Sequence, residues 1–245
     1  MKKLLSHIFT PIFFLVFALI LLIFHPIQVI CKNIWGYDMH KRSVSILNLF
    51  IFKSLRLMGS NIKVRGSFDL PANRPLIIVS NHQSTYDIPA ILWLFRNNHP
   101  KFISKKSLGK HIPSISYNLR HSGSALIDRK NPSQAIKEIF RLGRLIQENN
   151  FSACIFPEGT RTRTGQMRNF QSGGIKTLLK VAPDSLIVPF AISGNYKLHR
   201  YGKYPLSFGE QLAFTVLDPI EPKGIEPDEL VKQVQQHIQK TIQNT

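Results

Sequence analysis

The stretch VSNHQSTYD, residues 79–87, joins an apolar run to a helix-like segment. The run before it, residues 76–79, is rich in β-branched side chains and predicts a buried strand. The segment after it, DIPAILWL from Asp87, predicts a helix with an apolar face. His82 therefore stands where a strand ends and a helix begins, a common place for functional residues in α/β folds.

Beyond residue 58, strand-like and helix-like segments alternate. Residues 62–64, 76–80, 102–104, 125–127, 153–156, 187–192 and 213–217 are the predicted strands, and residues 88–95, 133–149, 173–181 and 227–243 are the predicted helices. This order predicts an α/β fold with a mixed, largely parallel sheet flanked by helices. No interior linker or repeat is visible, so we expect residues 59–245 to form one α/β domain.

The N-terminal segment is strongly apolar. No Lys, Arg, Asp or Glu occurs between residues 4 and 31, and residues 8–24 are apolar apart from Thr10 and Pro11. As a helix, residues 8–24 would span about 26 Å, slightly less than the hydrocarbon layer of about 30 Å. This length leaves a tilted span, a re-entrant hairpin and a signal peptide open. Residues 25–27 make a poor cleavage site, which favours a retained membrane anchor.

A second apolar stretch, residues 44–58, is interrupted by Lys53 and Arg56, which favours an interfacial helix. With Pro26 between them, the two segments could form a helical hairpin in one leaflet. We therefore predict an N-terminal hydrophobic helical membrane anchor at residues 1–58. Basic residues flank the first segment on both sides, so the charge pattern either leaves the orientation open or places both ends on the cytoplasmic face.

The formal net charge of +18 fits three classes of partner: nucleic acid, an anionic membrane leaflet or an acidic substrate. The anchor puts the leaflet first, because each Lys or Arg near an anionic surface adds about 1 kcal/mol of attraction. The basic residues are scattered, without zinc-finger spacing or basic heptads, so we expect no nucleic-acid partner. The 2 cysteines imply no disulfide framework, which fits a cytoplasmic catalytic domain.

Polar residues gather just after the predicted strands. They are Asn81-His82, Lys105-Lys106, Asp128-Arg129 and the run Pro157-Glu158-Gly159-Thr160-Arg161. In open sheets of this kind, ligands bind beyond the carboxyl ends of the strands. This grouping is the strongest indication of a functional site in the sequence.

His82 and Asp87 could act together. A histidine that removes a proton from an alcohol needs one free ring nitrogen, and a carboxylate on the other nitrogen fixes the tautomer and stabilises the imidazolium. The alternative is that Asp87 only caps the following helix and His82 is a turn residue. The spacing alone favours neither interpretation.

The segment FPEGTRT, residues 156–162, has the character of a phosphate-binding turn. Gly159 allows a tight turn with exposed N–H groups, and the guanidinium of Arg161 suits phosphate. Glu158 could hold that arginine or a substrate hydroxyl. The alternative is a surface turn with an ordinary ion pair. The segment GSALIDR, residues 123–129, is similar but is a weak indication by itself.

Five blocks in this order resemble the glycerolipid acyltransferases, and most closely the bacterial 1-acylglycerol-3-phosphate (lysophosphatidate) acyltransferases. The blocks are NHQSTYD, FISKKSLGK, GSALIDR, FPEGTRT and IVPFAISG, and the resemblance runs from about residue 64 to residue 194. The resemblance implies that His82, oriented by Asp87, is the general base for the hydroxyl of lysophosphatidate. The alkoxide would attack the thioester of acyl-CoA or acyl-acyl-carrier protein directly and give phosphatidate, with no metal or other cofactor.

The resemblance also implies the residues that bind the acceptor. Glu158, Gly159, Thr160 and Arg161 would contact its glycerol phosphate, Arg129 would make a second phosphate contact, and Lys105 would add positive charge. It further implies a protein on the cytoplasmic (inner) membrane whose catalytic domain faces the cytoplasm and contacts membrane lipids. In two places the chain departs from the family pattern. Gln171 stands where many relatives have a lysine, and Phe190 is bulkier than expected.

Other functions remain as alternatives. A serine hydrolase is disfavoured because no Gly-x-Ser-x-Gly elbow occurs, and no His-Glu-x-x-His motif or cysteine pair indicates a metal site. Within the acyltransferases, the acceptor could instead be glycerol 3-phosphate or another lysophospholipid. Outside enzymes, the chain could be a basic, membrane-tethered module that binds anionic lipid, and His82→Ala would then leave its activity intact.

Overall fold

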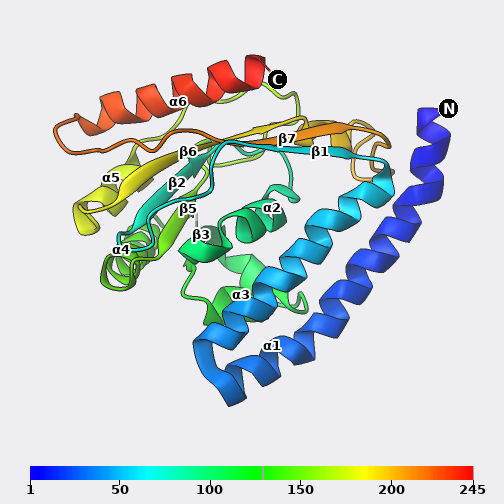
Figure 1. Cartoon of the computed structure of the whole chain (residues 1–245), viewed down its shortest axis with the longest axis horizontal. Coiled ribbons are helices and arrows are strands. Elements are labelled where there is room, and N and C mark those ends of the chain that lie inside the picture. Colours follow the sequence, from blue (N-terminus) through cyan, green and yellow to red (C-terminus); the bar gives the residue numbers. More distant parts are fainter. Residues whose placement is uncertain (129, 245) are drawn as a thin grey trace.

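The computed structural model describes residues 1–128 and 130–244, which form a sheet of 7 strands between two helical layers (Figure 1). The strands are β1 (Asn61–Arg65), β2 (Leu76–Ser80), β3 (Pro100–Lys105), β4 (Ala125–Ile127), β5 (Ser152–Ile155), β6 (Leu186–Ser193) and β7 (Gln211–Val216). The helices are α1 (Lys2–Ser54), α2 (Asp87–Leu94), α3 (Ile115–His121), α4 (Pro132–Asn149), α5 (Gly173–Val181) and α6 (Pro227–Gln243). Short 3₁₀ helices are η1 (Leu55–Met58), η2 (Arg96–Asn98), η3 (Lys106–Gly109) and η4 (Asn195–His199).

The strand order is β1-β7-β6-β2-β5-β3-β4. Neighbouring strands pair in parallel, except that β6 and β7 are antiparallel. The prediction of a mixed, largely parallel sheet flanked by helices is therefore confirmed. The carboxyl ends of β2, β3, β4 and β5 consequently meet at one edge of the sheet, which is the edge where the sequence places its polar residues.

The apolar run that predicts β2 is buried on both faces of the sheet. Leu76 and Ile78 belong to the core under α1 and α2, and Ile77 and Val79 belong to the core under α4, α5 and α6. Side chains alternate between the two faces of a strand, so a strand in the middle of three layers needs an unbroken apolar run.

The predicted element bounds agree well with the structure. The bounds of β2, β4, α5 and α6 match the predicted ranges, and the other predicted strands and helices end within one or two residues of the observed ones. Local caps explain part of this agreement, because the side chain of Asn131 accepts from Gln134 N at 3.0 Å and Pro132 begins α4. The sequence did not predict α3.

Helix α1 is a helical hairpin, and the chain reverses direction at its lower end in Figure 1. The two apolar segments do form a hairpin, but the helix continues through Pro26 and is interrupted at Gly36, with φ 75° and ψ −153°. Only glycine adopts this backbone conformation readily, so the chain can reverse direction at Gly36. A proline within a helix removes one hydrogen bond, and the helix continues through Pro26 despite this loss. The two limbs of the hairpin pack together through Leu21 of the first limb and Leu47 and Ile51 of the second.

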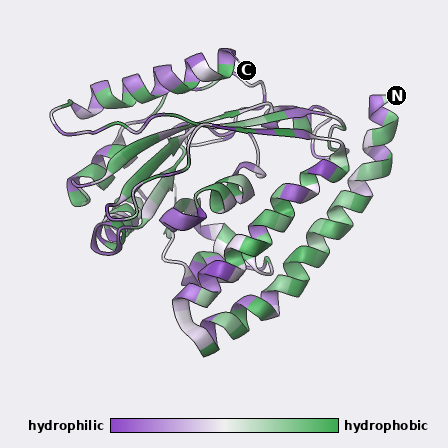
Figure 2. Cartoon of the chain, viewed as in Figure 1, coloured by the Kyte–Doolittle hydropathy of each residue, from purple (hydrophilic) through white to green (hydrophobic). Residues whose placement is uncertain are grey.

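The outer face of the hairpin is apolar and exposed (Figure 2). Exposed side chains along the first limb include Leu4, Ile8, Ile12, Leu15, Leu19, Leu22, Ile23, Ile30, Ile34 and Trp35. Within the described residues, 1 helix is long and apolar enough to cross a membrane, judged by length and composition only. An exposed apolar face of this extent favours association with a membrane.

We expect Gly36→Ala to lower the free energy of unfolding by about 1–3 kcal/mol, because the backbone conformation at this position is unfavourable for alanine. The added Cβ would meet nothing within 4 Å, so the loss would come from the backbone alone. Thermal unfolding in detergent, followed by circular dichroism, measures the change. Gly173→Ala is a matched control, because its Cβ also meets nothing within 4 Å but its φ is not positive. Equal melting temperatures for the two variants would contradict this account of the turn.

Candidate active site

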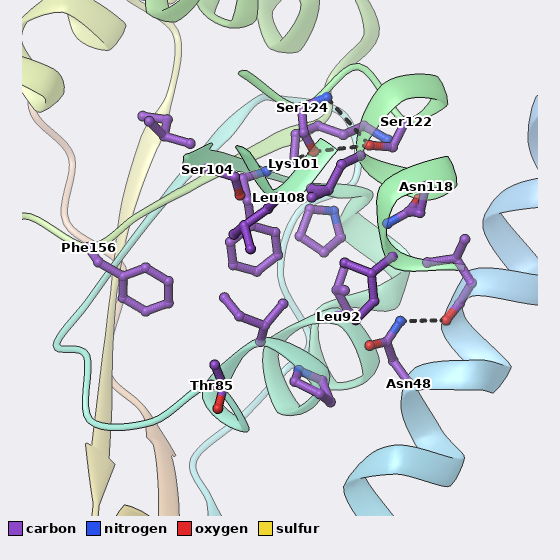
Figure 3. A pocket seen from close by; sticks show the side chains of 18 of the residues that line it. Asn48, Thr85, Leu92, Lys101, Ser104, Leu108, Asn118, Ser122, Ser124 and Phe156 are labelled. Atoms are coloured by element: carbon purple, nitrogen blue, oxygen red, sulfur yellow. Dashed lines mark hydrogen bonds between the residues drawn. The ribbon is translucent and has the colours of Figure 1, made fainter. Parts of the chain in front are cut away.

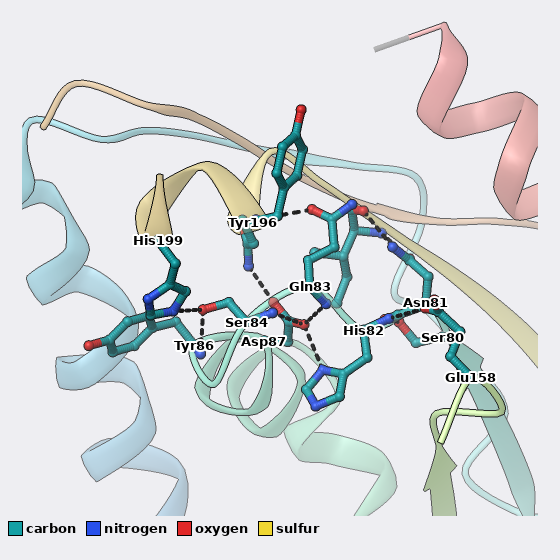
Figure 4. A network of polar contacts seen from close by, with 12 residues as sticks. Ser80, Asn81, His82, Gln83, Ser84, Tyr86, Asp87, Glu158, Tyr196 and His199 are labelled. Atoms are coloured by element: carbon teal, nitrogen blue, oxygen red, sulfur yellow. Dashed lines mark hydrogen bonds and ion pairs between the residues drawn. The ribbon is translucent and has the colours of Figure 1, made fainter. Parts of the chain in front are cut away.

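His82 and Asp87 form a hydrogen-bonded pair in the loop between β2 and α2 (Figure 4). His82 follows the end of β2 by two residues, and Asp87 is the first residue of α2. His82 Nδ1 and Asp87 Oδ2 lie 2.9 Å apart. The strand end and the helix start thus hold the two groups within hydrogen-bond reach, as general-base chemistry requires.

The carboxylate of Asp87 is fully buried and held by several donors. Its Oδ2 accepts from the backbone N–H groups of Gln83 at 2.7 Å and Ser84 at 2.9 Å. Its Oδ1 accepts from Asn195 Nδ2 at 2.6 Å. These donors precede α2 or come from η4, so the carboxylate orients the loop and the imidazole. In the described part of the chain, none of its hydrogen bonds comes from an N–H group of α2.

The imidazole of His82 stacks on Phe156, with ring centroids 4.0 Å apart and planes 14° apart. Because Nδ1 faces a carboxylate, Nδ1 carries the proton in the neutral ring and Nε2 has a free lone pair. Within residues 1–128 and 130–244, no protein group hydrogen-bonds to Nε2. The side chain is 17% exposed and lines the main pocket, so Nε2 can accept a proton from a bound molecule.

Glu158 ties the loop after β5 to the loop after β2. Its Oε1 accepts from His82 N at 2.7 Å, and its Oε2 accepts from Arg168 N at 2.9 Å. Burial raises the pKa of Glu158, while the two backbone N–H groups act in the opposite direction. Both carboxylate oxygens are therefore engaged by the backbone, and a contact between Glu158 and an acceptor stays a prediction.

The turn that follows β5 faces the pocket. Gly159 N donates to Phe156 O at 3.0 Å, and Gly159 has a φ of 69°, which glycine adopts readily. Gly159, Thr160 and Arg161 line the same pocket as His82, and so does Lys105 at the end of β3. Five of the predicted site residues thus line one pocket, and two more, Asp87 and Glu158, are hydrogen-bonded to His82 beside it. Arg129, also predicted for this site, lies outside the described residues.

The pocket is a cavity of about 810 Å³ that extends from His82 toward the hairpin. It lies among β3, α2, α3 and the second limb of α1, and its lining is mainly apolar (Figure 3). Apolar lining residues include Val44, Leu47, Ile88, Leu92 and Leu119. Of the two departures from the family pattern, Gln171 lines the cavity, whereas Phe190 is buried in the core.

Sequence reasoning missed Asn195 and Phe156 as parts of this site. Asn195 lies 108 positions from Asp87 in the chain, and no motif connects the two residues. Phe156 was predicted as the last residue of a strand, but it lies one position beyond β5, where its ring can stack on His82. Within the described residues, no group of 3 or more His, Cys, Asp or Glu side chains could hold a metal ion.

Known proteins resemble this chain in sequence and in fold. A model of the acyltransferase family matches residues 61–193, more than half of the 245 residues. The 1-acyl-sn-glycerol-3-phosphate acyltransferase alpha of Mus musculus is 25% identical over 188 residues, which cover 77% of this chain and 65% of the mouse protein. The 1-acyl-sn-glycerol-3-phosphate acyltransferase of Cocos nucifera is 33% identical over 140 residues, which cover 57% of this chain and 44% of that protein.

The crystal structure of the 1-acyl-sn-glycerophosphate (LPA) acyltransferase PlsC from Thermotoga maritima has the same fold. It superposes with a TM-score of 0.83 at 23% sequence identity and covers 100% of this chain and 97% of its own. The alignment with the mouse protein thus spans slightly less than two thirds of that relative, whereas the structural match spans nearly the whole of both chains. From the family match and the site geometry together, we conclude that the chain belongs to the acyltransferase family.

Proposed function

We propose that the protein transfers an acyl group from a thioester to the free sn-2 hydroxyl of lysophosphatidate and so produces phosphatidate. The observation that carries this proposal is the His82–Asp87 pair, whose free Nε2 lies in a pocket with a cationic turn and an apolar cavity. The family membership and the relatives' activities support the same assignment. The donor is acyl-CoA or acyl-acyl-carrier protein.

In the proposed reaction, His82 Nε2 removes the proton from the acceptor hydroxyl while Asp87 stabilises the imidazolium that forms. The alkoxide oxygen attacks the thioester carbonyl and forms a tetrahedral intermediate. This intermediate expels the thiolate, and the imidazolium returns its proton to the sulfur. One ester bond forms and one thioester bond breaks, with no acyl-enzyme. Buried donors around Asp87 keep the carboxylate in place throughout.

The two ends of an amphipathic substrate match the two parts of the pocket. Arg161, Lys105 and the N–H groups of the turn suit the phosphate of the acceptor. The apolar cavity suits an acyl chain, since burial of CH₂ groups contributes roughly 0.8 kcal/mol each. Arg129 is proposed as a further phosphate contact, and Glu158 and Thr160 are proposed to shape or contact the same subsite.

The hairpin would hold this site at the lipid surface. We propose that residues 1–58 form the membrane anchor and residues 59–245 form the acyltransferase domain. The exposed apolar face of α1 and the net charge of +18 support binding to an anionic leaflet. Both acceptor and product are lipids, so a site beside the anchor can exchange them with the bilayer. The proposed location is the cytoplasmic (inner) membrane, with the catalytic domain facing the cytoplasm.

Labelled acyl transfer from acyl-CoA and from acyl-acyl-carrier protein to a panel of acceptors tests this function. The panel contains lysophosphatidate and lysophosphatidylcholine, both supplied in detergent micelles, and glycerol 3-phosphate, which is supplied in solution. The proposal predicts phosphatidate as the main product. Transfer to another acceptor alone would overturn the acceptor assignment, and binding to anionic vesicles without any transfer would indicate a non-enzymatic module.

We expect Arg161→Ala to raise the KM for lysophosphatidate about 10- to 100-fold, with a smaller effect on kcat, because a charge-assisted contact to phosphate is lost. Arg161→Lys should recover part of the loss, since it restores the charge without the planar fork. The matched control is Arg163→Ala, because Arg163 is exposed in the same loop and does not line the pocket. Equal KM values for the two alanine variants would exclude this role for Arg161.

A further inference from the structure

A buried lysine lies at the end of the cavity away from His82. Lys101 is 3% exposed, and its Nζ donates to Tyr37 Oη at 2.7 Å. The ammonium also lies over the rings of Tyr37 and Phe151, at 4.7 Å and 4.8 Å from their centroids. Lys101 and Lys105 both line the cavity, and they lie four positions apart on β3, which separates their Cα atoms by about 13 Å.

Figure 3 shows Lys101 and Phe156 in different parts of the pocket. Lys101 lies with Ser122 and Ser124 on one side of the pocket, and Phe156, on which His82 stacks, lies on another side. The apolar side chains of Leu92 and Leu108 line the same pocket. The cavity thus has two polar ends joined by an apolar middle.

Further cations line the Lys101 end. Lys41 and Arg96 border the same cavity, and Lys41 lies close enough to Lys101 to affect its ionisation. Within the described residues, neither Lys41, Arg96 nor Lys101 forms an ion pair. Asp38 is an acidic side chain that faces Lys41 and His99. Three cations therefore share this end of the cavity without a paired carboxylate.

This arrangement costs free energy in the absence of an anion. A buried ammonium without a counter-ion is unfavourable, because burial removes its hydration. Burial and, to a lesser extent, Lys41 lower the pKa of Lys101 to about 7. Methionine or leucine would fill such a position without this cost, so a ligand that pairs with the ammonium explains the presence of a lysine better than packing does.

We propose that the Lys101 end of the cavity binds the carboxylate of a fatty acid whose chain occupies the apolar middle. We call this end the distal anion site and define it by Tyr37, Lys41, Arg96 and Lys101. The carboxylate would accept a hydrogen bond from Lys101 Nζ, which has two further N–H donors besides the one used by Tyr37. A carboxylate fits better than a phosphate dianion, since Lys101 is the one buried cation of the three, whereas Lys41 and Arg96 are half-buried and keep part of their hydration.

The orientation of the bound fatty acid would be the reverse of that of a reacting acyl chain. Its carboxylate lies at Lys101, away from His82, so the molecule is not positioned for transfer. Because we propose the same apolar space for the donor's acyl chain, a bound fatty acid would exclude the donor. This consequence rests on the proposed function, whereas the binding itself does not. The distal anion site would thus make the enzyme sensitive to free fatty acid.

Binding of dodecanoate and of dodecanol to the full-length protein in detergent micelles tests the proposal by calorimetry, without any acyl transfer. Both ligands have the same chain and differ in the headgroup. We expect dodecanoate to bind at least about tenfold more tightly than dodecanol to the wild-type protein, since a charge-assisted hydrogen bond is gained. Lys101→Met should remove this preference, and Lys101→Arg should retain part of it.

Lys240→Met is the matched control, because Lys240 is exposed on α6 and does not line the cavity. This variant should keep the wild-type preference. Circular dichroism verifies that each variant is folded, and Lys101→Gln replaces Lys101→Met in the test if the latter does not fold. Equal affinities of the two ligands for the wild-type protein would overturn the proposal. An undiminished preference in the variants that remove the charge of Lys101 would also overturn it.

Discussion

His82→Ala should lower kcat/KM for acyl transfer by at least about 10²- to 10⁴-fold, because the reaction loses its general base. In the structure, Nδ1 of His82 is hydrogen-bonded to Asp87 at 2.9 Å, and Nε2 is available to a molecule bound in the pocket that His82 lines. Among the described lining residues, no other imidazole pairs with a buried carboxylate in this way. The measurement is the initial rate of labelled acyl transfer to lysophosphatidate at several substrate concentrations.

The loss of activity in His82→Ala should come from the chemical step and not from a change in folding or lipid binding. The side chain of His82 is half-buried and contacts Phe156, so its loss should leave the fold and the binding of lipid largely intact. His237→Ala is the matched control, because His237 is exposed on α6 on the opposite side of the sheet. If His82→Ala kept more than a tenth of the wild-type rate, another group would have to be the base.

Asp87→Asn should also lower kcat by about 10²- to 10⁴-fold, because a neutral amide cannot stabilise the imidazolium that forms in the transition state. The surroundings of residue 87 can accommodate the Asp87→Asn substitution. Asn195 Oδ1 is buried and has no hydrogen-bond partner in the described structure. A flip of the Asn195 amide would let this oxygen accept from the new amide at position 87. The melting temperature should therefore fall much less than the rate.

Asn195→Ala provides the comparison for Asp87→Asn. It removes one donor from Asp87 Oδ1 and leaves the three donors on Oδ2, namely His82 Nδ1 and the N–H groups of Gln83 and Ser84. We expect a loss of about tenfold in kcat, which corresponds to one hydrogen bond to a charged group. Equal activity of Asp87→Asn and the wild type would show that the carboxylate is not part of the chemistry.

Much of the fold follows from local sequence features. The β-branched run predicts a buried strand, and β2 is indeed buried on both faces. The prolines at the first positions of α4 and α6 mark the starts of these helices. Two features were not predictable in this way. Helix α3 is 7 residues long and follows Pro113 and Ser114 without a clear apolar period. The hairpin turn depends on a backbone conformation at Gly36. Gly36 is the only glycine before residue 59, but the apolar pattern does not show which residue between the two segments makes the turn.

In the site, too, some contacts follow from local sequence features and others do not. His82 and the turn at residues 158–161 follow parallel strands, so their approach could be predicted from the rule that carboxyl ends share one edge. The backbone role of Glu158 could not be predicted, because it depends on how two loops meet. The contact of Asn195 with Asp87 likewise depends on the position of η4 beside α2.

A single-turnover reaction tests the central claim most directly. The enzyme is mixed with a labelled acyl thioester, with and without lysophosphatidate, and the label is followed in protein, free fatty acid and phosphatidate. Direct transfer assisted by His82 predicts that the label moves only when the acceptor is present, and only into phosphatidate. Label bound covalently to the protein, or released as free fatty acid at the same rate without the acceptor, would contradict the account.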